Sequence, residues 1–118
     1  LNEKEIKYID SLGFEIGSHS YSHTLLSRLD KFEQSSELLK SKLFLENLLN
    51  HEIKSFCYPY GGPDSYSQET IDLLKLHGYK NATIVSSRDI NKSDITNGFE
   101  IPRYDCNEID SLYKFSKY

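Results

Sequence analysis

Two histidines separated by three residues offer the clearest chemistry in this sequence, in the segment His19-Ser20-Tyr21-Ser22-His23. Imidazole nitrogens are common ligands of zinc and other first-row metal ions. If the segment makes a helical turn, both rings project from one face and can share an ion. A catalytic zinc usually takes three protein ligands and keeps one position open for water, so two histidines make an incomplete site. The alternative is a surface pair in a polar loop.

A second polar turn follows the apolar run that ends at Tyr58, with the sequence Pro59-Tyr60-Gly61-Gly62. The aromatic rings of Tyr21 and Tyr60 would suit stacking on a sugar, because a tyrosine has an apolar face and a hydroxyl that stays hydrated. Tyr58 lies inside the apolar run and is expected in the core.

The remaining titratable residues point to less specific roles. We expect His51 to be exposed and His77 to act as a cation at the end of a helix. Asp64, Asp89 and Asp105 are typical of turns and loops, although Asp105 follows a predicted strand and could reach a cleft.

The elements that must position these residues follow from periodicity and capping signals. The patterns predict a helix at 3–12, a strand at 14–17, a helix at 30–50, a strand at 53–58, a helix that opens with Ser65 and Gln68 and closes at Gly78, a strand at 79–85, a loop at 86–98, a strand at 100–104 and a helix from Asn107 through Phe115.

Strands separated by helices of this length are most simply joined by parallel crossovers, which predicts an α/β fold with one mainly parallel sheet. Ligands in such folds bind at the carboxyl ends of the strands. The histidine pair and Tyr60 both follow predicted strands. We therefore expect the ring nitrogens of His19 and His23 to lie within about 4 Å of each other, or to reach that distance by a rotamer change, since metal–imidazole bonds are about 2.0–2.1 Å. We also expect both side chains to face the same cavity as Tyr60.

Composition sets further bounds. The 118 residues form one expected domain, 1–118, and the net charge of −4 has the wrong sign for a protein that binds nucleic acid by counterion release. No apolar run approaches the roughly 20 residues of a membrane span. The two cysteines, Cys57 and Cys106, are too few for a disulfide scaffold.

Four segments in the same order resemble the polysaccharide deacetylases, the NodB-homology family also called carbohydrate esterase family four. Residues 13–27, with His19 and His23, resemble the second family motif, H-[ST]-x-x-H. Residues 56–61 resemble the third motif, residues 77–83 resemble the GYxxA segment, and Ile101-Pro102-Arg103 resembles a late "lpR" strand.

This resemblance implies a fold and a reaction. The fold would be a partial (β/α) barrel, and the protein would be a metal-dependent hydrolase that removes N- or O-acetyl groups from an acetylated polysaccharide. His19 and His23 would bind the divalent ion, with zinc expected, and the backbone N–H of Tyr60 would stabilise the oxyanion. Pro59 would fix that turn, and Tyr21, Pro59 and Tyr60 would contact the sugar. The resemblance also implies a place in carbohydrate metabolism outside the cell or at the cell envelope.

The sequence also departs from the family pattern. The first family motif, T-F-D-D, supplies a base and a metal ligand and is expected to lie before Leu1, so the chain would be the C-terminal portion of the domain. Cys57 stands where the third motif often has arginine, and Arg103 is expected to do that charge work by pairing with the base. No L-x-H motif is visible. The alternatives are a non-catalytic carbohydrate-binding relative and, with little support, a metal-storage protein. An open sheet edge would be expected to recruit another copy of the chain.

Overall fold

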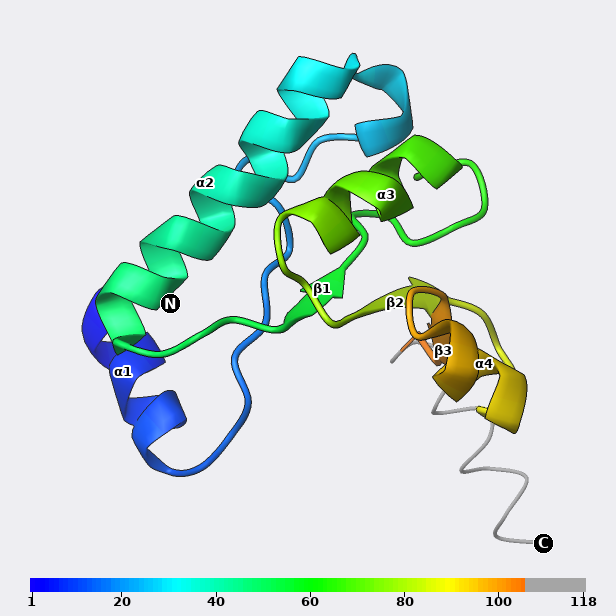
Figure 1. The fold of residues 1–118 in the computed structure, drawn as a ribbon. Coiled ribbons are helices and arrows are strands. Elements are labelled where there is room, and N and C mark those ends of the chain that lie inside the picture. Colours follow the sequence, from blue (N-terminus) through cyan, green and yellow to red (C-terminus); the bar gives the residue numbers. More distant parts are fainter. Residues whose placement is uncertain (106–118) are drawn as a thin grey trace, which may run out of the picture.

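The computed structural model describes residues 1–105 and contains a three-stranded sheet flanked by helices (Figure 1). The elements along the chain are α1 (Glu3–Ser11), a 3₁₀ turn (Leu26–Arg28), α2 (Lys31–Leu49), β1 (Ser55–Cys57), α3 (Gln68–Leu76), β2 (Asn81–Val85), α4 (Lys92–Asn97) and β3 (Ile101–Arg103). No helix in this part of the chain is both long and apolar enough to cross a membrane.

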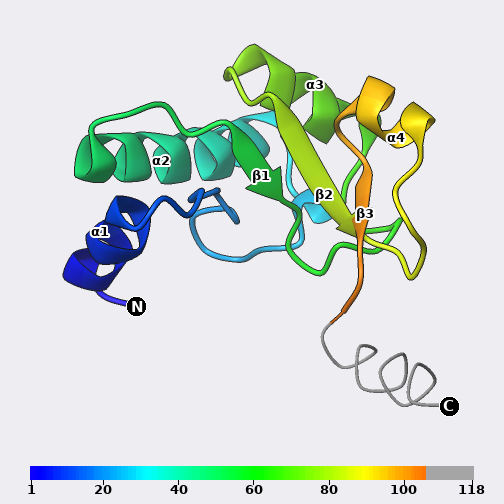
Figure 2. The ribbon, with the colours of Figure 1, turned by 90° about the horizontal axis from the view of Figure 1, so that it is seen from below.

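The sheet has the order β1-β2-β3, and both pairs of strands are parallel. In Figure 2 the three arrows lie side by side and point the same way. Phe56 of β1 is in register with Ala82 of β2, and Ile84 of β2 with Pro102 of β3. The predicted parallel sheet is confirmed for the segments 53–58, 79–85 and 100–104, each of which contains one strand.

The core lies between the sheet and the two helices α2 and α3. Phe56 and Ala82 of the sheet pack in one cluster with Leu38 of α2 and Leu74 of α3, and each of these side chains is at most 2% exposed. Tyr58 is fully buried in the same cluster and donates its hydroxyl to Phe99 O at 2.8 Å. Its predicted place in the core is therefore confirmed.

Local capping explains where the two N-terminal helices begin. Asn2 and Glu5 form the predicted capping box at the start of α1. The side chain of Asp30 accepts the backbone N–H of Glu33 at the start of α2, and Asn50 ends that helix in the left-handed conformation. The 30–50 prediction is thus correct to within one residue at each end.

Helix α1 lies against the C-terminal end of α2 (Figure 1), where Asp10 and His51 form an exposed ion pair at 2.8 Å. The carbonyl of Glu52 and the carboxylate of Asp10 raise the pKa of His51. A raised pKa contributes stability that is fully present below the unfolded pKa and is lost as the pH rises through the folded pKa.

We therefore expect a small fall in the urea midpoint between about pH 5.5 and about pH 8.5, a range that brackets the ordinary histidine pKa. The Asp10→Asn variant should show a weaker pH dependence, because it loses the carboxylate and keeps the carbonyl of Glu52. An unchanged pH profile in that variant would show that the ion pair is not its source.

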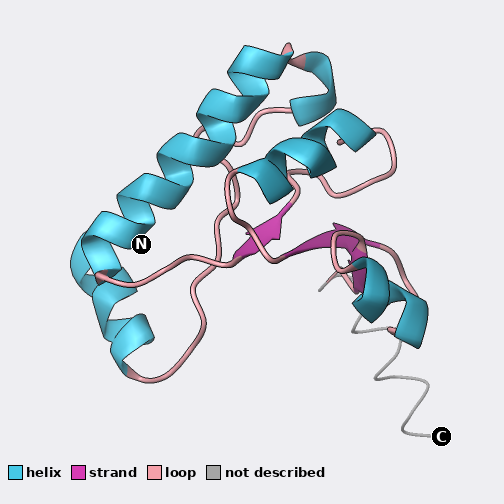
Figure 3. Cartoon of the chain, in the orientation of Figure 1, coloured by secondary structure: helices cyan, strands magenta, loops and turns pink. Residues whose placement is uncertain are grey.

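The predicted strand at 14–17 is wrong. The connection between α1 and α2 is loop apart from the 3₁₀ turn (Figure 3), and Ser18 alone pairs with β1, through one parallel bridge to Phe56. A strand needs a partner strand along its length. Residues 14–17 lie before the parallel bridge at Ser18, so partners for 14–16 would have to lie before β1, which begins only at Ser55. Phe14 is 64% exposed, so the alternation of apolar and charged residues did not reflect a buried face.

Two further boundaries differ from the prediction. Helix α3 is capped by Ser67 and Thr70 rather than by Ser65 and Gln68, because the Ser65 hydroxyl donates to Gly62 O within the preceding turn. The predicted loop at 86–98 contains α4, whose capping box of Asn91 and Asp94 was the overlooked signal. The helix predicted from Asn107 lies outside the described residues.

Candidate functional site

The histidine pair lies in a loop at the edge of the sheet. Ser18 N donates to Ser55 O at 2.9 Å and Cys57 N donates to Ser18 O at 2.9 Å, so the residue before His19 is fixed against β1. The rings of His19 and His23 meet edge to face with their centroids 4.7 Å apart. Both side chains are exposed.

The pair does not sit on the helical turn considered above. Ser20 and His23 have φ values of 66° and 56°, in the left-handed region that residues with a Cβ rarely adopt. The backbone N–H of His23 donates to the Ser20 hydroxyl at 2.9 Å, which closes the turn. The two imidazoles therefore meet through a tight, irregular loop, and strained backbone of this kind is often found at functional sites.

The tautomer of His19 follows from its partner. Its Nδ1 lies 2.7 Å from the carbonyl oxygen of Cys57, and a carbonyl can only accept, so Nδ1 carries the proton. In the neutral ring the lone pair then sits on Nε2. Metal-ligating histidines are commonly oriented by such a bond from the other ring nitrogen to a backbone carbonyl.

Tyr60 follows β1 and brings a second loop to the histidines. Its ring contacts that of His23 edge to face, with centroids 5.0 Å apart. The preceding Pro59 is buried, whereas the Tyr60 side chain is 63% exposed and its φ is +70°. Within residues 1–105, the backbone N–H of Tyr60 donates to no protein acceptor. The structure thus brings Tyr60 to the histidine pair.

Gly61 sets the shape of this turn. Its φ is +74°, and a Cβ placed there would lie 2.5 Å from Val85 Cγ2 and 3.0 Å from Val85 N. We expect Gly61→Ala to destabilise the protein by at least about 1–2 kcal/mol, the cost of left-handed backbone, and to shift the NMR signals of Tyr60 and His23.

Gly62→Ala is the matched control for Gly61→Ala, since a Cβ at Gly62 meets nothing within 4 Å. Urea denaturation and NMR spectra of both variants make the measurement. Equal effects of the two substitutions would contradict a special role for Gly61.

Arg103 lies at the carboxyl end of β3, where its carbonyl accepts the N–H of Ser86 at 3.1 Å. The positive charge of Arg103 influences the pKa values of Cys57 and His19. Burial opposes ionisation of the Cys57 thiol, but contacts with His19 and Thr83 and the charge of Arg103 outweigh it and lower the pKa of Cys57. The bond to Cys57 raises the pKa of His19, against burial and the charge of Arg103. Among the described residues, the buried Nε of Arg103 has no hydrogen-bond partner.

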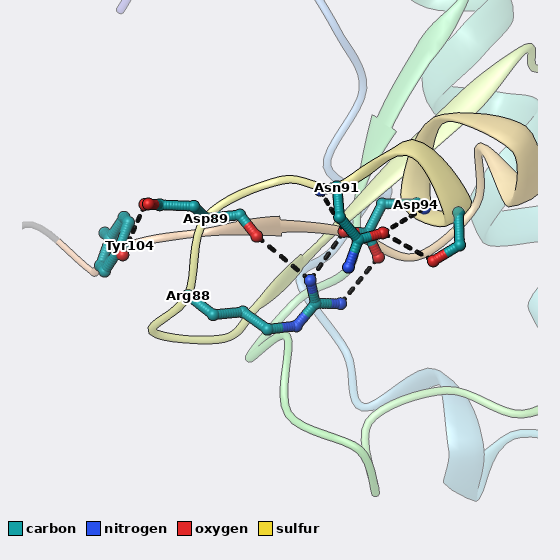
Figure 4. A network of polar contacts seen from close by, with 6 residues as sticks. Arg88, Asp89, Asn91, Asp94 and Tyr104 are labelled. Atoms are coloured by element: carbon teal, nitrogen blue, oxygen red, sulfur yellow. Dashed lines mark hydrogen bonds and ion pairs between the residues drawn. The ribbon is translucent and has the colours of Figure 1, made fainter.

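The loop after β2 is fixed by a polar network next to this edge (Figure 4). Arg88 forms a two-pronged ion pair with Asp94, with both N–O distances 2.7 Å, and Asn91 N also donates to Asp94. These bonds, Arg88 first, lower the pKa of Asp94 to about 2. Tyr104 donates its hydroxyl to Asp89 at 2.9 Å. Asp89 is thus part of a structural network that holds the chain beyond Arg103.

Tyr21 points to a different side of the site. Its side chain is 63% exposed, and it lines a hollow of about 340 Å³ together with His19, Ser20, Ser41, Phe44 and Leu45. Tyr60 does not line this hollow and reaches the site through His23 instead. Of the two histidines and Tyr60, only His19 lines this hollow. The rings of His19 and Tyr60 both contact that of His23, but this hollow is not a cavity that all three residues face.

His77 is not the predicted helix cation. It caps the C-terminus of α3, and its Nε2 lies 2.6 Å from the Ser35 hydroxyl. Burial lowers the pKa of His77, which favours the neutral ring. The expected exposure of His51 is confirmed, with 47% of its side chain accessible.

The residues present fit part of a metal site. His19 Nε2 and the adjacent ring of His23 provide two imidazole ligands of the type that zinc takes. Within residues 1–105, no group of three His, Cys, Asp or Glu side chains is placed to hold an ion. The described residues therefore supply two ligands and not a complete set.

The sequence profile of the family described as polysaccharide deacetylase matches residues 2–82, which is more than half of the chain. The chain belongs to the polysaccharide deacetylase family. It is 30% identical over 80 residues to YxkH of Bacillus subtilis (strain 168), whose name also carries the words polysaccharide deacetylase. This match covers 68% of the chain and 28% of YxkH.

Solved structures share the fold. The deacetylase PplD of Streptococcus pyogenes, in complex with acetate, superposes with a TM-score of 0.75 at 23% identity, over 88% of this chain and 44% of that one. The polysaccharide deacetylase BC0361 of Bacillus cereus gives 0.75 at 23% identity, over 88% and 32%. BA3943 of Bacillus anthracis, a CE4 family pseudoenzyme, gives 0.65 at 16% identity, over 98% and 45%.

These similarities establish the fold as part of the (β/α) barrel of the NodB-type deacetylases. The chain spans less than half the length of each of these relatives.

Proposed function

We propose that this chain provides the histidine half of the active site of a metal-dependent polysaccharide deacetylase. The observation that supports this most directly is the contact of His19, His23 and Tyr60 at the carboxyl edge of a family fold. The reaction is hydrolysis of an acetyl group, in which water adds to the carbonyl carbon, the bond to the sugar nitrogen or oxygen breaks, and acetate leaves.

Each residue has a defined task in this proposal. His19 and His23 hold a divalent ion, for which we propose zinc because its usual ligands include imidazole. Such an ion polarises a carbonyl and activates water. The Tyr60 amide donates to the oxyanion that forms on the acetyl oxygen, and the buried Pro59 fixes the turn that aims it. Tyr21 and Tyr60 offer exposed rings to the sugar.

Arg103 completes the proposed site from the third strand. Its buried Nε is without a partner among the described residues, and a buried guanidinium nitrogen is costly unless it is paired. A carboxylate is its natural partner. We propose that Arg103 pairs with the family's catalytic base.

The second candidate is a non-catalytic relative that keeps the fold for carbohydrate binding. One observation favours it: BA3943, named as a pseudoenzyme, shares the fold. Fold alone therefore does not decide between the two functions.

Acetate release from an N-acetylglucosamine oligomer separates these functions. The 118-residue chain alone should release none, because a positioned base is typically worth about 10²- to 10⁴-fold. A chimera that places the aspartate-pair segment of a family member ahead of residue 1 should release acetate, and a chelator should stop it. Turnover by the chain alone would mean that an internal acid such as Asp105 completes the site. A folded, zinc-loaded chimera that binds the oligomer without releasing acetate would favour the non-catalytic function.

The setting of the reaction is also a proposal. We propose an extracellular or cell-envelope location, because acetylated polysaccharides are found there. We further propose that the outer edge of β3, which pairs with no further strand among residues 1–105, can pair with another copy of the chain. Light scattering of the purified chain tests this association.

A further inference from the structure

We propose that Glu37 on α2 is a positioning residue for the histidine pair. It lies outside every segment that resembles the family motifs, and its carboxylate accepts hydrogen bonds from Tyr21 and Ser22, two of the three residues between the histidines. The inference rests on the proposed metal site, because it names the residue that forms this site before an ion arrives.

Three hydrogen bonds converge on this one carboxylate. Tyr21 N donates to Glu37 Oε2 at 2.9 Å and Ser22 N donates to the same oxygen at 2.8 Å. The Ser22 hydroxyl donates to the other oxygen, Oε1. Two consecutive backbone N–H groups that no helix or strand satisfies are thus paired by a side chain from a different element.

The contacts fall at the point where the loop needs them. Ser20 and His23, on either side of the two held residues, have left-handed φ values. Because residues with a Cβ disfavour this region, the turn persists only if other contacts fix it. Hydrogen bonds to an ionised carboxylate are the stronger, charge-assisted kind.

Helix α2 holds the loop at a second point, one turn further along. The Ser18 hydroxyl, which directly precedes His19, lies 2.6 Å from the Ser41 hydroxyl in a buried contact. Positions 37 and 41 are four apart and therefore lie on one face of the helix. The start and the middle of the histidine segment are therefore both attached to this face of α2, next to the fully buried Leu38.

Glu37 has no part in the hydrophobic core. Its side chain is half-buried and the bonds that it makes to the loop are at the surface. Its removal should therefore change the loop far more than the stability of the fold. Glu33 provides the matched control, since it lies one turn earlier on the same helix, is exposed and carries the same charge, and its carboxylate contacts neither Tyr21 nor Ser22.

The test compares Glu37→Ala, Glu37→Gln and Glu33→Ala in the 118-residue chain. Amide exchange by NMR reports on the N–H groups of Tyr21 and Ser22, and titration with zinc, followed on the ring signals of His19 and His23, reports on affinity. We expect Glu37→Ala to speed exchange of both amides at least about tenfold and to weaken zinc binding by about 10- to 100-fold, the usual effect of losing an outer-shell partner. Glu37→Gln keeps a neutral acceptor, so its amide exchange rates and zinc affinity should lie between those of Glu37→Ala and the parent chain. Glu33→Ala should match the parent chain in both measurements.

Two results would overturn the inference. One is unchanged amide exchange in Glu37→Ala. The other is a loss of zinc affinity no larger than in Glu33→Ala. A separate arm tests the metal site itself: if His19→Ala leaves zinc binding unchanged while Glu37→Ala still exposes the two amides, the proposed metal site is wrong and the attachment of the loop to Glu37 stands.

Discussion

Replacing His19 or His23 by alanine should reduce acetate release by the active chimera more than about 100-fold, beyond the 10- to 100-fold typical of losing an outer-shell partner. Each substitution leaves one imidazole, and a single imidazole from this loop cannot hold the ion. Both side chains are exposed, so the free energy of unfolding should change little. Acetate release, zinc titration and urea denaturation make the measurement.

His51→Ala is the matched control for these variants, because His51 is also exposed but pairs with Asp10 at the far end of α2. It should keep both zinc affinity and activity. If His51→Ala weakens zinc binding as much as His23→Ala, the ion binds to surface histidines in general and the loop is not the site.

Replacing Phe56 by alanine should destabilise the protein by about 3–5 kcal/mol, the usual cost of removing a large buried aromatic side chain. Phe56 is 2% exposed, and its ring meets those of Tyr58 and Tyr79 edge to face, with centroids 5.6 and 5.4 Å away. Since domains are stable by only about 5–15 kcal/mol, this variant should be partly unfolded in mild denaturant. Urea denaturation followed by circular dichroism gives the value.

Phe32 provides the comparison for this substitution, because it has the same side chain but is 87% exposed at the start of α2. Phe32→Ala should change stability by less than about 0.5 kcal/mol. A similar loss in both variants would mean that Phe56 is not the centre of the core between the sheet and α2.

Local interactions allowed the helices to be predicted from the sequence. The caps at Asn2 and Asp30 join residues three apart, so the residues that define these helix ends stand next to each other in the chain. The same local reading missed α4, whose capping box at Asn91 lacks an apolar period to support it. It also misplaced a strand at 14–17, because whether a segment becomes a strand depends on a partner from elsewhere in the chain.

For the candidate site, too, the sequence predicted what depends on local signals and missed what depends on distant contacts. The sequence alone identified His19, His23 and Tyr60 as site candidates by residue type and motif and, for Tyr60, by its position after a strand. Only the tertiary structure decided which nitrogen of His19 is available, because its partner Cys57 O is 38 residues away, and which side chain holds the loop, because Glu37 is 16 residues from Tyr21. Sequence spacing carries information about neighbours within a turn or two. Contacts across such separations exist only after α2 and β1 have packed together, and their packing brings the two histidines of a polar loop into edge-to-face contact.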